Sequence, residues 1–330
     1  MSGRIEVQQR ASPPPADRPL VSVIVPTRNR APLLARSVMS VLGQSWRNLE
    51  LIVVDDGSTD DTAAVLAAVD DPRLRVLRRQ QGSSAAAARN AGIGAARGSY
   101  LAFNDDDDIW LPHKLERQMS ALLAAPAGFG LCLCGRLLLA PGRAALISGA
   151  ARAGELDFRR GNGRGGPDYA LIATPSWVVR RSALEAVGGF DERLVTWEDW
   201  ELALRLWQQY DVLVLDEPLY VQDQLAGGHL FRLERAKADA LRVIEDKHGA
   251  LWAHDRRVRA RHQYVIGLAL SLHEPRPAGR AELWHSLRLH PWSAKTLTAL
   301  FLTCVPDAWS RRTASLLRRL RATIHRATVA

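Results

Sequence analysis

Short apolar runs alternate with segments of helical period along the first hundred residues. Residues 21–25 form a β-branched run stopped by Pro26, and residues 51–54 form a second run stopped by an Asp-Asp-Gly turn. Runs of this kind are typical of strands buried on both faces of a parallel sheet. Between them, apolar side chains recur at the spacing of one helix face: Leu33, Leu34, Val38, Val41 and Leu42. The pattern predicts strand, helix, strand.

The alternation continues to residue 103. We expect a helix beginning near Ser58, with Ser58 and Asp61 as a capping box. A strand over residues 74–77, an alanine-rich helix over 84–96 and a strand over 100–103 follow. This order predicts an α/β fold with an open, mostly parallel, Rossmann-like sheet flanked by helices, whose ligands bind beyond the carboxyl ends of the strands. The loops to examine are then residues 26–30, 55–61 and 104–108.

The rest of the chain suggests a division into three parts. Residues 1–19 are rich in proline, have no apolar period and are expected to form a flexible leader. We expect further strands within residues 131–139 and 177–179, a helix over 198–209, and mostly helices after residue 230. The predicted parts are therefore a leader (residues 1–19), an α/β domain (20–230) and a basic helical C-terminal region (231–330).

The positive charge is confined to that C-terminal region. The 330-residue chain carries a formal net charge of +9, yet residues 231–330 hold 19 Lys and Arg against 8 Asp and Glu. The first 230 residues are slightly acidic, which argues against a nucleic-acid partner for the α/β domain. Arginines interleave with leucines over residues 311–321, a pattern that fits either peripheral contact with an anionic membrane or a helical cap with solvated arginines.

The cysteines and the apolar runs bear on location. Cys132, Cys134 and Cys304 have no metal-site spacing, and we interpret them as buried reduced thiols. No apolar run reaches the roughly 20 residues of a membrane-spanning helix, and the N-terminus has no signal-peptide core. We expect a cytoplasmic protein, with peripheral contact at the inner membrane face if the tail binds lipid.

The strongest chemical signal is the run of four aspartates, residues 105–108, between two apolar segments. In an extended chain, Asp105 and Asp107 project to one side and Asp106 to the other. Two convergent carboxylates suit Mg²⁺ or Mn²⁺ that also binds phosphate oxygens. The alternative is a solvated acidic turn. His229, in a glycine-rich loop, is a candidate third ligand or phosphate contact.

Two further groups stand beside helices. Asp56 follows the second strand, where a carboxylate accepts hydrogen bonds from a base or ribose, and Arg89 is placed to reach an anionic ligand. Glu198 and Asp199 stand at a predicted helix start between Trp197 and Trp200, where a carboxylate in a partly apolar pocket serves as a general base. Favourable pairing with the helix dipole is the alternative for that acid pair.

These motifs, in this order, resemble the family 2 glycosyltransferases over residues 20–230. Residues 23–30 are similar to the family's opening strand and loop, 53–60 to its nucleotide-binding turn, 104–108 to its DxD region and 197–200 to its ED motif. One departure is Asn104, where such enzymes commonly have an apolar residue, and four acids in a row leave the ligand register open by one residue.

The resemblance implies the GT-A fold, a divalent metal (Mn or Mg), a nucleotide-diphosphate donor such as a UDP- or dTDP-sugar, and inverting transfer to a hydroxyl of a glycan or lipid-linked acceptor in bacterial cell-surface glycan or glycolipid synthesis. The implied donor contacts are Pro26, Thr27, Arg28, Asp55, Asp56, Arg89, Asn90, Asp105 and Asp106. Asp199 is the implied base with Glu198 beside it; Trp177, Trp197 and Trp200 are assigned to the acceptor, and Asp105, Asp107 and His229 to the metal. Two alternatives stay open: a nucleotidyltransferase and a non-catalytic nucleotide-sugar-binding protein.

Overall fold

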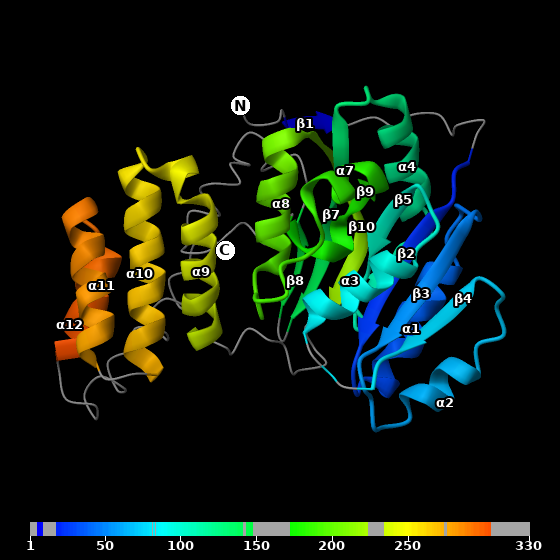
Figure 1. The fold of residues 1–330 in the computed structure, drawn as a ribbon, viewed down its shortest axis with the longest axis horizontal. Coiled ribbons are helices and arrows are strands. Elements are labelled where there is room, and N and C mark those ends of the chain that lie inside the picture. The colour runs from blue at the N-terminus through cyan, green and yellow to red at the C-terminus, as the bar shows by residue number, and fades with distance from the viewer. Residues whose placement is uncertain are drawn as a thin grey trace. The chain divides into compact units, whose positions relative to one another are not determined.

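The computed structural model describes residues 5–8, 18–80, 82, 84–140, 143–147, 172–223, 234–273 and 276–304. These residues fall into two compact units (Figure 1). The described residues up to 223 belong to the first unit and those from 234 onward to the second.

The first unit is built on a single sheet, which has ten strands in the described residues. Along the sheet the order is β1-β10-β7-β9-β5-β2-β3-β4, with β6 on β10 and β8 on β7. The main path is parallel except for β9, which runs antiparallel to both β5 and β7. The strands are β1 Ile5–Gln8, β2 Val21–Thr27, β3 Leu49–Asp55, β4 Leu74–Arg78, β5 Tyr100–Phe103, β6 Ile109–Trp110, β7 Phe129–Ala140, β8 Arg143–Ile147, β9 Val178–Arg180 and β10 Asp211–Asp223.

Helices cover both faces of this sheet. Val23 and Val25 of β2 pack in one cluster with residues of α1 and α4, whereas Ile24, which points the other way, meets Gly92 of α3. This two-sided burial explains why the strands are continuous apolar runs. The helices of the first unit are α1 Ala31–Leu42, α2 Thr62–Ala67, α3 Ala85–Ala95, α4 Lys114–Ala124, the 3-10 turn η1 Thr174–Ser176, α7 Arg181–Val187 and α8 Glu198–Gln209.

The predicted strands and helices are largely confirmed, with three corrections. The proposed leader contains β1, which pairs in parallel with β10. The predicted capping box at Ser58 is wrong, because α2 begins at Thr62 and the Ser58 hydroxyl instead accepts a hydrogen bond from the Asn29 N–H. Of the three cysteines, Cys132 and Cys134 lie buried on β7, but Cys304 is exposed.

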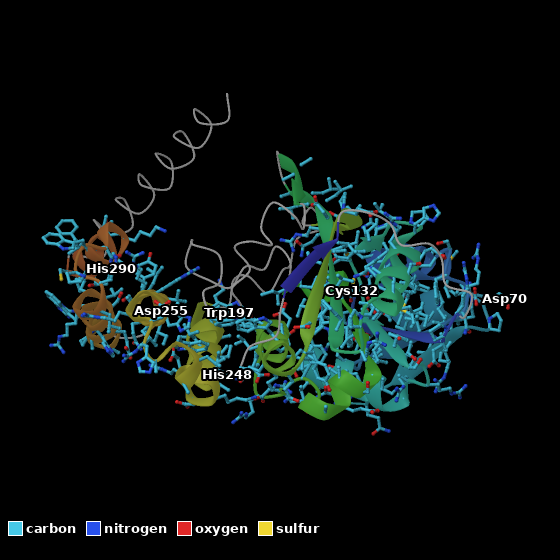
Figure 2. All side chains as sticks on the ribbon, turned by 90° about the horizontal axis from the view of Figure 1, so that it is seen from above. Asp70, Cys132, Trp197, His248, Asp255 and His290 are labelled. Atoms are coloured by element: carbon cyan, nitrogen blue, oxygen red, sulfur yellow. The ribbon has the colours of Figure 1, made fainter. Side chains whose placement is uncertain are left out.

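The described part of the second unit is helical. It consists of α9 Glu234–His248, the 3-10 turn η3 Gly249–Trp252, α10 Arg256–His273, α11 Arg276–Leu289 and α12 Ala294–Cys304, and neighbouring helices pack side by side (Figure 1). In Figure 2, His248 marks the end of α9, Asp255 precedes α10, and His290 lies between α11 and α12. Among the described residues, no helix combines the length and apolar character that crossing a bilayer requires.

Candidate active site

The chain reverses its direction of travel across the sheet between β2 and β5, and the shortlisted loops meet there. The order β4-β3-β2-β5 makes this pair of strands the topological switch point of an α/β sheet, where ligands bind beyond the carboxyl ends. The Thr27 hydroxyl at the end of β2 donates to Asp106 Oδ2 at 2.8 Å, and the Asp56 N–H donates to the Thr27 carbonyl at 2.9 Å. The three strand-end loops therefore form one site.

Two of these loops are cross-braced. The Asn29 N–H donates to Ser58 Oγ (3.0 Å), and Asn29 Oδ1 accepts from the Thr59 N–H (2.8 Å). The Ala31 N–H donates to Asp60 Oδ2 (3.1 Å). Asn29 has φ 54°, in the left-handed region that asparagine tolerates better than most residues. The bracing fixes the loop after β2 against the loop after β3.

The aspartate run forms a turn, so the alternation of side chains expected of an extended chain does not apply to it. The Asp108 N–H donates to the Asp105 carbonyl at 3.2 Å. Buried Asn104 closes the turn from inside, because its amide donates to Ser37 Oγ (2.9 Å) and to the Asp108 carbonyl (3.1 Å). An apolar side chain could not make these hydrogen bonds, which explains why asparagine occupies this position.

Each aspartate faces a different partner. Asp105 meets Arg89 at 2.8 Å, Asp106 accepts from Thr27, Asp107 faces Arg30 at 3.8 Å, and Asp108 Oδ1 accepts from the Asp223 N–H at 3.3 Å. Burial raises the pKa of Asp106 to about 7, against the lowering effect of the Thr27 hydrogen bond. Burial, with Asp105 and Asp107 nearby, also raises the pKa of Asp108 well above its ordinary value.

Arg89 connects the aspartate turn to the predicted base. Its side chain, from α3, is only 6% exposed and donates to Asp105 Oδ1 at 2.8 Å and to Glu198 Oε1 at 2.7 Å. Burial alone would lower the pKa of Arg89, but the Asp105 and Glu198 carboxylates outweigh it and raise the pKa. Arg89 is thus the counter-cation of Asp105, as Arg30 is of Asp107, and the Arg89 guanidinium lies over the Phe190 ring at 5.5 Å.

Glu198 and Asp199 begin α8 immediately after a strained residue. Trp197 has φ 66°, a left-handed conformation that is unfavourable for a bulky side chain and is found disproportionately at functional sites. Asp199 Oδ1 accepts from the Trp200 N–H at 2.7 Å. Burial and the neighbouring Glu198 raise the pKa of Asp199 to about 7. A carboxylate with this pKa suits proton abstraction near neutrality.

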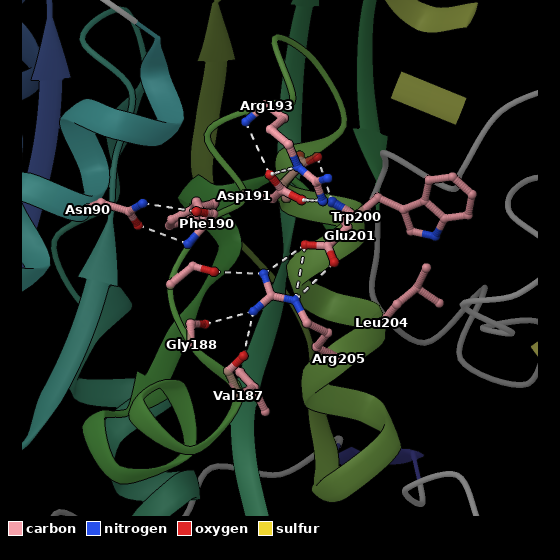
Figure 3. Close-up of polar contacts among 12 residues, drawn as sticks. Asn90, Val187, Gly188, Phe190, Asp191, Arg193, Trp200, Glu201, Leu204 and Arg205 are labelled. Atoms are coloured by element: carbon pink, nitrogen blue, oxygen red, sulfur yellow. Dashed lines mark hydrogen bonds and ion pairs between the residues drawn. The ribbon is translucent and has the colours of Figure 1, made fainter. Parts of the chain in front are cut away.

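A half-buried arginine, Arg205, anchors α8, and the sequence analysis did not identify it. Arg205 pairs with Glu201, which is fully buried, at 2.7 Å, and donates to the backbone carbonyls that end α7, those of Val187, Gly188 and Gly189. Figure 3 shows Arg205 between these carbonyls and Glu201. The spacing of four residues between Glu201 and Arg205 on a predicted helix was the available signal.

Several predicted site residues hold the structure together. The Asn90 amide accepts from the Phe190 N–H (2.8 Å) and donates to the Phe190 carbonyl (2.9 Å), so it clamps the loop after α7 (Figure 3). Asp55 Oδ1 accepts from the Ser58 N–H at 2.9 Å within its turn. Trp177 is fully buried against Phe103 and Phe190.

The remaining predicted residues range from exposed to buried, and one of them lies outside the described residues. Pro26 is half-buried, and exposed Arg28 packs its guanidinium against the backbone at Gly82. Asp56 is buried and pairs with Arg79 at 2.8 Å, a partner that no sequence signal indicated. Trp197 and Trp200 are 5% and 1% exposed and pack edge to face, behind Asp199. His229 and residues 311–321 lie outside the described residues.

The donor set of the aspartate turn fits a hard divalent cation. Among the described residues there is no ready group of three His, Cys, Asp or Glu side chains around one point. Mg²⁺, however, is usually held by one or two carboxylates together with substrate phosphates. Asp105 is 33% exposed at its side chain, and Asp107 is the other acid predicted to bind the metal. The buried Asp108 Oδ2 has no hydrogen-bond partner among the described residues.

Comparison with known proteins agrees with the geometry. The chain is 41% identical over 104 residues to the Escherichia coli UDP-Glc:alpha-D-GlcNAc-diphosphoundecaprenol beta-1,3-glucosyltransferase WfgD, a match that covers 32% of this chain and 41% of that protein. The chain thus matches only about two fifths of that relative's length.

Two solved structures share the fold. S. aureus TarS 1-349 with UDP-GlcNAc superposes with a TM-score of 0.61 at 20% identity, over 86% of this chain and 90% of that one. The mannosyltransferase PcManGT from Pyrobaculum calidifontis with GDP-Man and Mn²⁺ gives 0.55 at 22% identity, over 94% and 88%. The likeness confirms the predicted GT-A fold.

The family comparison covers the strand-end loops and α3, although α8 lies beyond its end. The model described as Glycosyl transferase family 2 matches residues 22–188, half of the chain, and so includes Thr27, Asp56, Arg89 and the aspartate turn. The chain therefore belongs to glycosyl transferase family 2, as its motifs predict.

Proposed function

We propose that this protein transfers a sugar from a nucleotide-diphosphate donor to a hydroxyl group, with inversion at the anomeric carbon. The UDP-glucose substrate of WfgD and the UDP-GlcNAc bound to TarS support a UDP-sugar donor and an acceptor in bacterial cell-surface glycan or glycolipid synthesis. The observation that carries the proposal is the position of Arg89, which joins the aspartate turn to the start of α8, where Asp199 has a pKa of about 7.

Asp199 acts as the general base. Its carboxylate takes the proton of the acceptor hydroxyl while that oxygen bonds to the anomeric carbon. The bond from the anomeric carbon to the diphosphate oxygen breaks, and its electron pair leaves with the nucleoside diphosphate. Glu198 keeps one oxygen on Arg89, so it orients the pair and leaves Asp199 as the acid free to titrate near neutrality.

The nucleotide half of the site is formed by the strand-end loops. Thr27 lies beside the aspartate turn, and Asp56, held by Arg79, faces the base or ribose. We assign the metal to Asp105 and Asp107, with Asp106 next to them. These carboxylates would hold a divalent cation, which would supply positive charge against the diphosphate leaving group. The Mn²⁺ in the related mannosyltransferase structure supports this assignment.

The base assignment is tested with Asp199→Asn, and Glu185→Gln on the exposed side of α7 is the matched control. UDP-glucose and UDP-GlcNAc with Mn²⁺ are screened by thermal shift for donor binding, since a bound ligand raises apparent stability. Release of UDP from the bound donor, with and without oligosaccharide acceptors, reports turnover. We expect Asp199→Asn to keep the shift and lose turnover by at least about a hundredfold. Near-normal turnover in this variant would mean that another group is the base.

The metal is tested separately. We expect EDTA to abolish turnover and Asp105→Asn to weaken the response to Mn²⁺, whereas Glu185→Gln responds normally. Turnover that survives exhaustive chelation removes Asp105 and Asp107 from the metal role.

The two alternatives give different products. A nucleotidyltransferase releases pyrophosphate from a nucleoside triphosphate and a sugar phosphate, whereas the proposed reaction releases a nucleoside diphosphate. A binding protein shifts its melting temperature with donor but releases nothing. The raised pKa of Asp199 favours catalysis over binding alone, because pKa shifts of this kind cluster at catalytic sites.

A further inference from the structure

The second unit exposes an unusual concentration of large apolar side chains. Seven large hydrophobic residues are exposed among the described residues, and four of them lie between residues 284 and 301. Their exposed fractions are 56% for Trp284, 89% for Trp292, 48% for Leu297 and 62% for Phe301. We call these four residues, on α11, α12 and their connection, the aromatic face.

The aromatic face is separate from the surface that the helices bury. Leu283 and Leu287 of α11 and Leu300 of α12 form a core cluster packed against Tyr264 and Leu268 of α10. Trp284 and Arg288 lie four residues apart, as do Leu297 and Phe301, so each pair occupies one exposed side of its helix. In the part of this unit that the structure describes, the core cluster forms without the four exposed side chains, and large apolar side chains left exposed in such number are typical of a binding surface.

The charge around the aromatic face selects the kind of ligand. Residues 276–304 contain four Arg and Lys residues but a single acid, Glu282, and Arg288 and Lys295 are exposed. Residues 305–330, the segment next along the chain, hold six arginines and one aspartate, and a second copy would bring the same basic face. Residues 305–330 or a second copy would therefore bring positive charge to a positively charged surface, whereas an anionic surface is complementary to it.

We propose that the aromatic face binds the surface of an anionic lipid bilayer. Tryptophan and phenylalanine side chains insert at the level of the lipid headgroups, and neighbouring arginine and lysine are attracted to anionic lipids. This site differs from the arginine-rich segment at residues 311–321, and it does not depend on the transfer reaction proposed above.

The test is co-sedimentation of the full chain with vesicles of phosphatidylcholine alone and of an equal mixture with phosphatidylglycerol. We expect binding to the anionic vesicles that weakens with added salt. The double variant Trp292→Ser with Phe301→Ser should bind about tenfold more weakly, as should Arg288→Gln with Lys295→Gln. The control, Met39→Ser with Val76→Ser, removes two exposed apolar side chains from the first unit and should bind normally.

Three results overturn the proposal. The first is a wild-type chain that does not sediment with anionic vesicles. The second is binding that survives the Trp292 and Phe301 substitutions and is lost only when residues 305–330 are deleted. The third is self-association without vesicles, measured by sedimentation velocity, that those same two substitutions abolish. Matching thermal unfolding curves for all variants show that they are folded.

Discussion

Replacing Arg89 by methionine removes the one cation that faces both Asp105 and Glu198 in the described structure while keeping a side chain of similar length. The guanidinium is 6% exposed and makes ion pairs of 2.8 Å and 2.7 Å. The substitution leaves two carboxylates without the cation, and one of them, Glu198, is only 13% exposed. The first unit must then hold two facing acids close together with no compensating charge.

The expected loss of stability follows from these exposures. Removing one partner of a buried ion pair costs about 3–5 kcal/mol. Asp105, at 33% exposure, is partly screened by water, which moves the estimate to the lower end, about 3 kcal/mol. Such a loss raises the unfolding equilibrium constant by about a hundredfold.

Hydrogen-exchange mass spectrometry in increasing urea reports this loss for the first unit alone, through peptides from α3 and α8. The matched control is Arg193→Met, because Arg193 is 66% exposed and its pair with Asp191 is worth at most about 1 kcal/mol. The Arg89→Met deficit should shrink toward about pH 4, where carboxylates take up protons. The reasoning is refuted if Arg89→Met and Arg193→Met are equally stable, or if the Arg89→Met deficit at about pH 4 is as large as it is at neutral pH.

Three further predictions concern Asp199, Trp197 and the glycines of α3. Because the Asp199 pKa is about 7, turnover should fall about tenfold per pH unit below pH 7, and a flat pH–rate profile contradicts this. Because a raised carboxyl pKa lowers stability at pH values above the ordinary pKa of the group, Asp199→Asn should stabilise the first unit against urea at pH 8 but not at pH 4, and an equal effect at the two pH values contradicts this. Trp197→Gly should be about 1 kcal/mol more stable than Trp197→Ala, because the φ of 66° at residue 197 favours glycine. At Trp207, which is equally buried but lies within α8, alanine should be more stable than glycine. Urea unfolding that ranks glycine and alanine alike at both sites argues against strain at Trp197. Gly92→Ala should lower the free energy of unfolding by about 1–3 kcal/mol, because the new Cβ would lie 2.5 Å from Ile24 Cγ2. Gly94→Ala, whose Cβ meets nothing within 4 Å, should raise it by up to about 1 kcal/mol. Thermal unfolding that ranks the two variants alike would count against the packing argument.

The sequence predicted the strands that carry the strongest pattern and missed those that do not. Residues 21–25 and 51–54 are continuous apolar runs, so β2 and β3 were predictable. In contrast, β10 is interrupted at residues 216–218 by two acids and a proline, where its register against β7 shifts. A local pattern cannot reveal a strand whose pairing continues across such an irregularity.

The site follows the same division. Loops at strand ends are local features, and their common position follows from the sheet order. The pairing of Arg89 with Glu198 joins residues 109 positions apart, and Asn90 clamps Phe190 across 100 positions. Arg89 and Asn90 are both predicted donor contacts. Composition and spacing identify polar side chains near a site, but only the folded chain decides which of them face a ligand and which face each other.

The braced loops at Asn29 have a consequence for the kinetics of the donor binding that we propose. Hydrogen bonds of the fold itself join Asn29 to Ser58 and Thr59, and Ala31 to Asp60. A ligand that docks against ordered loops avoids about 0.5–1.5 kcal/mol of ordering free energy for each side chain that would otherwise be immobilised. Asn29→Gly tolerates the same φ and keeps the backbone bond to Ser58, but it removes the side-chain brace to Thr59. It should therefore slow association of the proposed donor more than it weakens contacts within the complex. In the proposed reaction, the hydrogen bonds of the fold thus hold the two loops to which we assign the nucleotide.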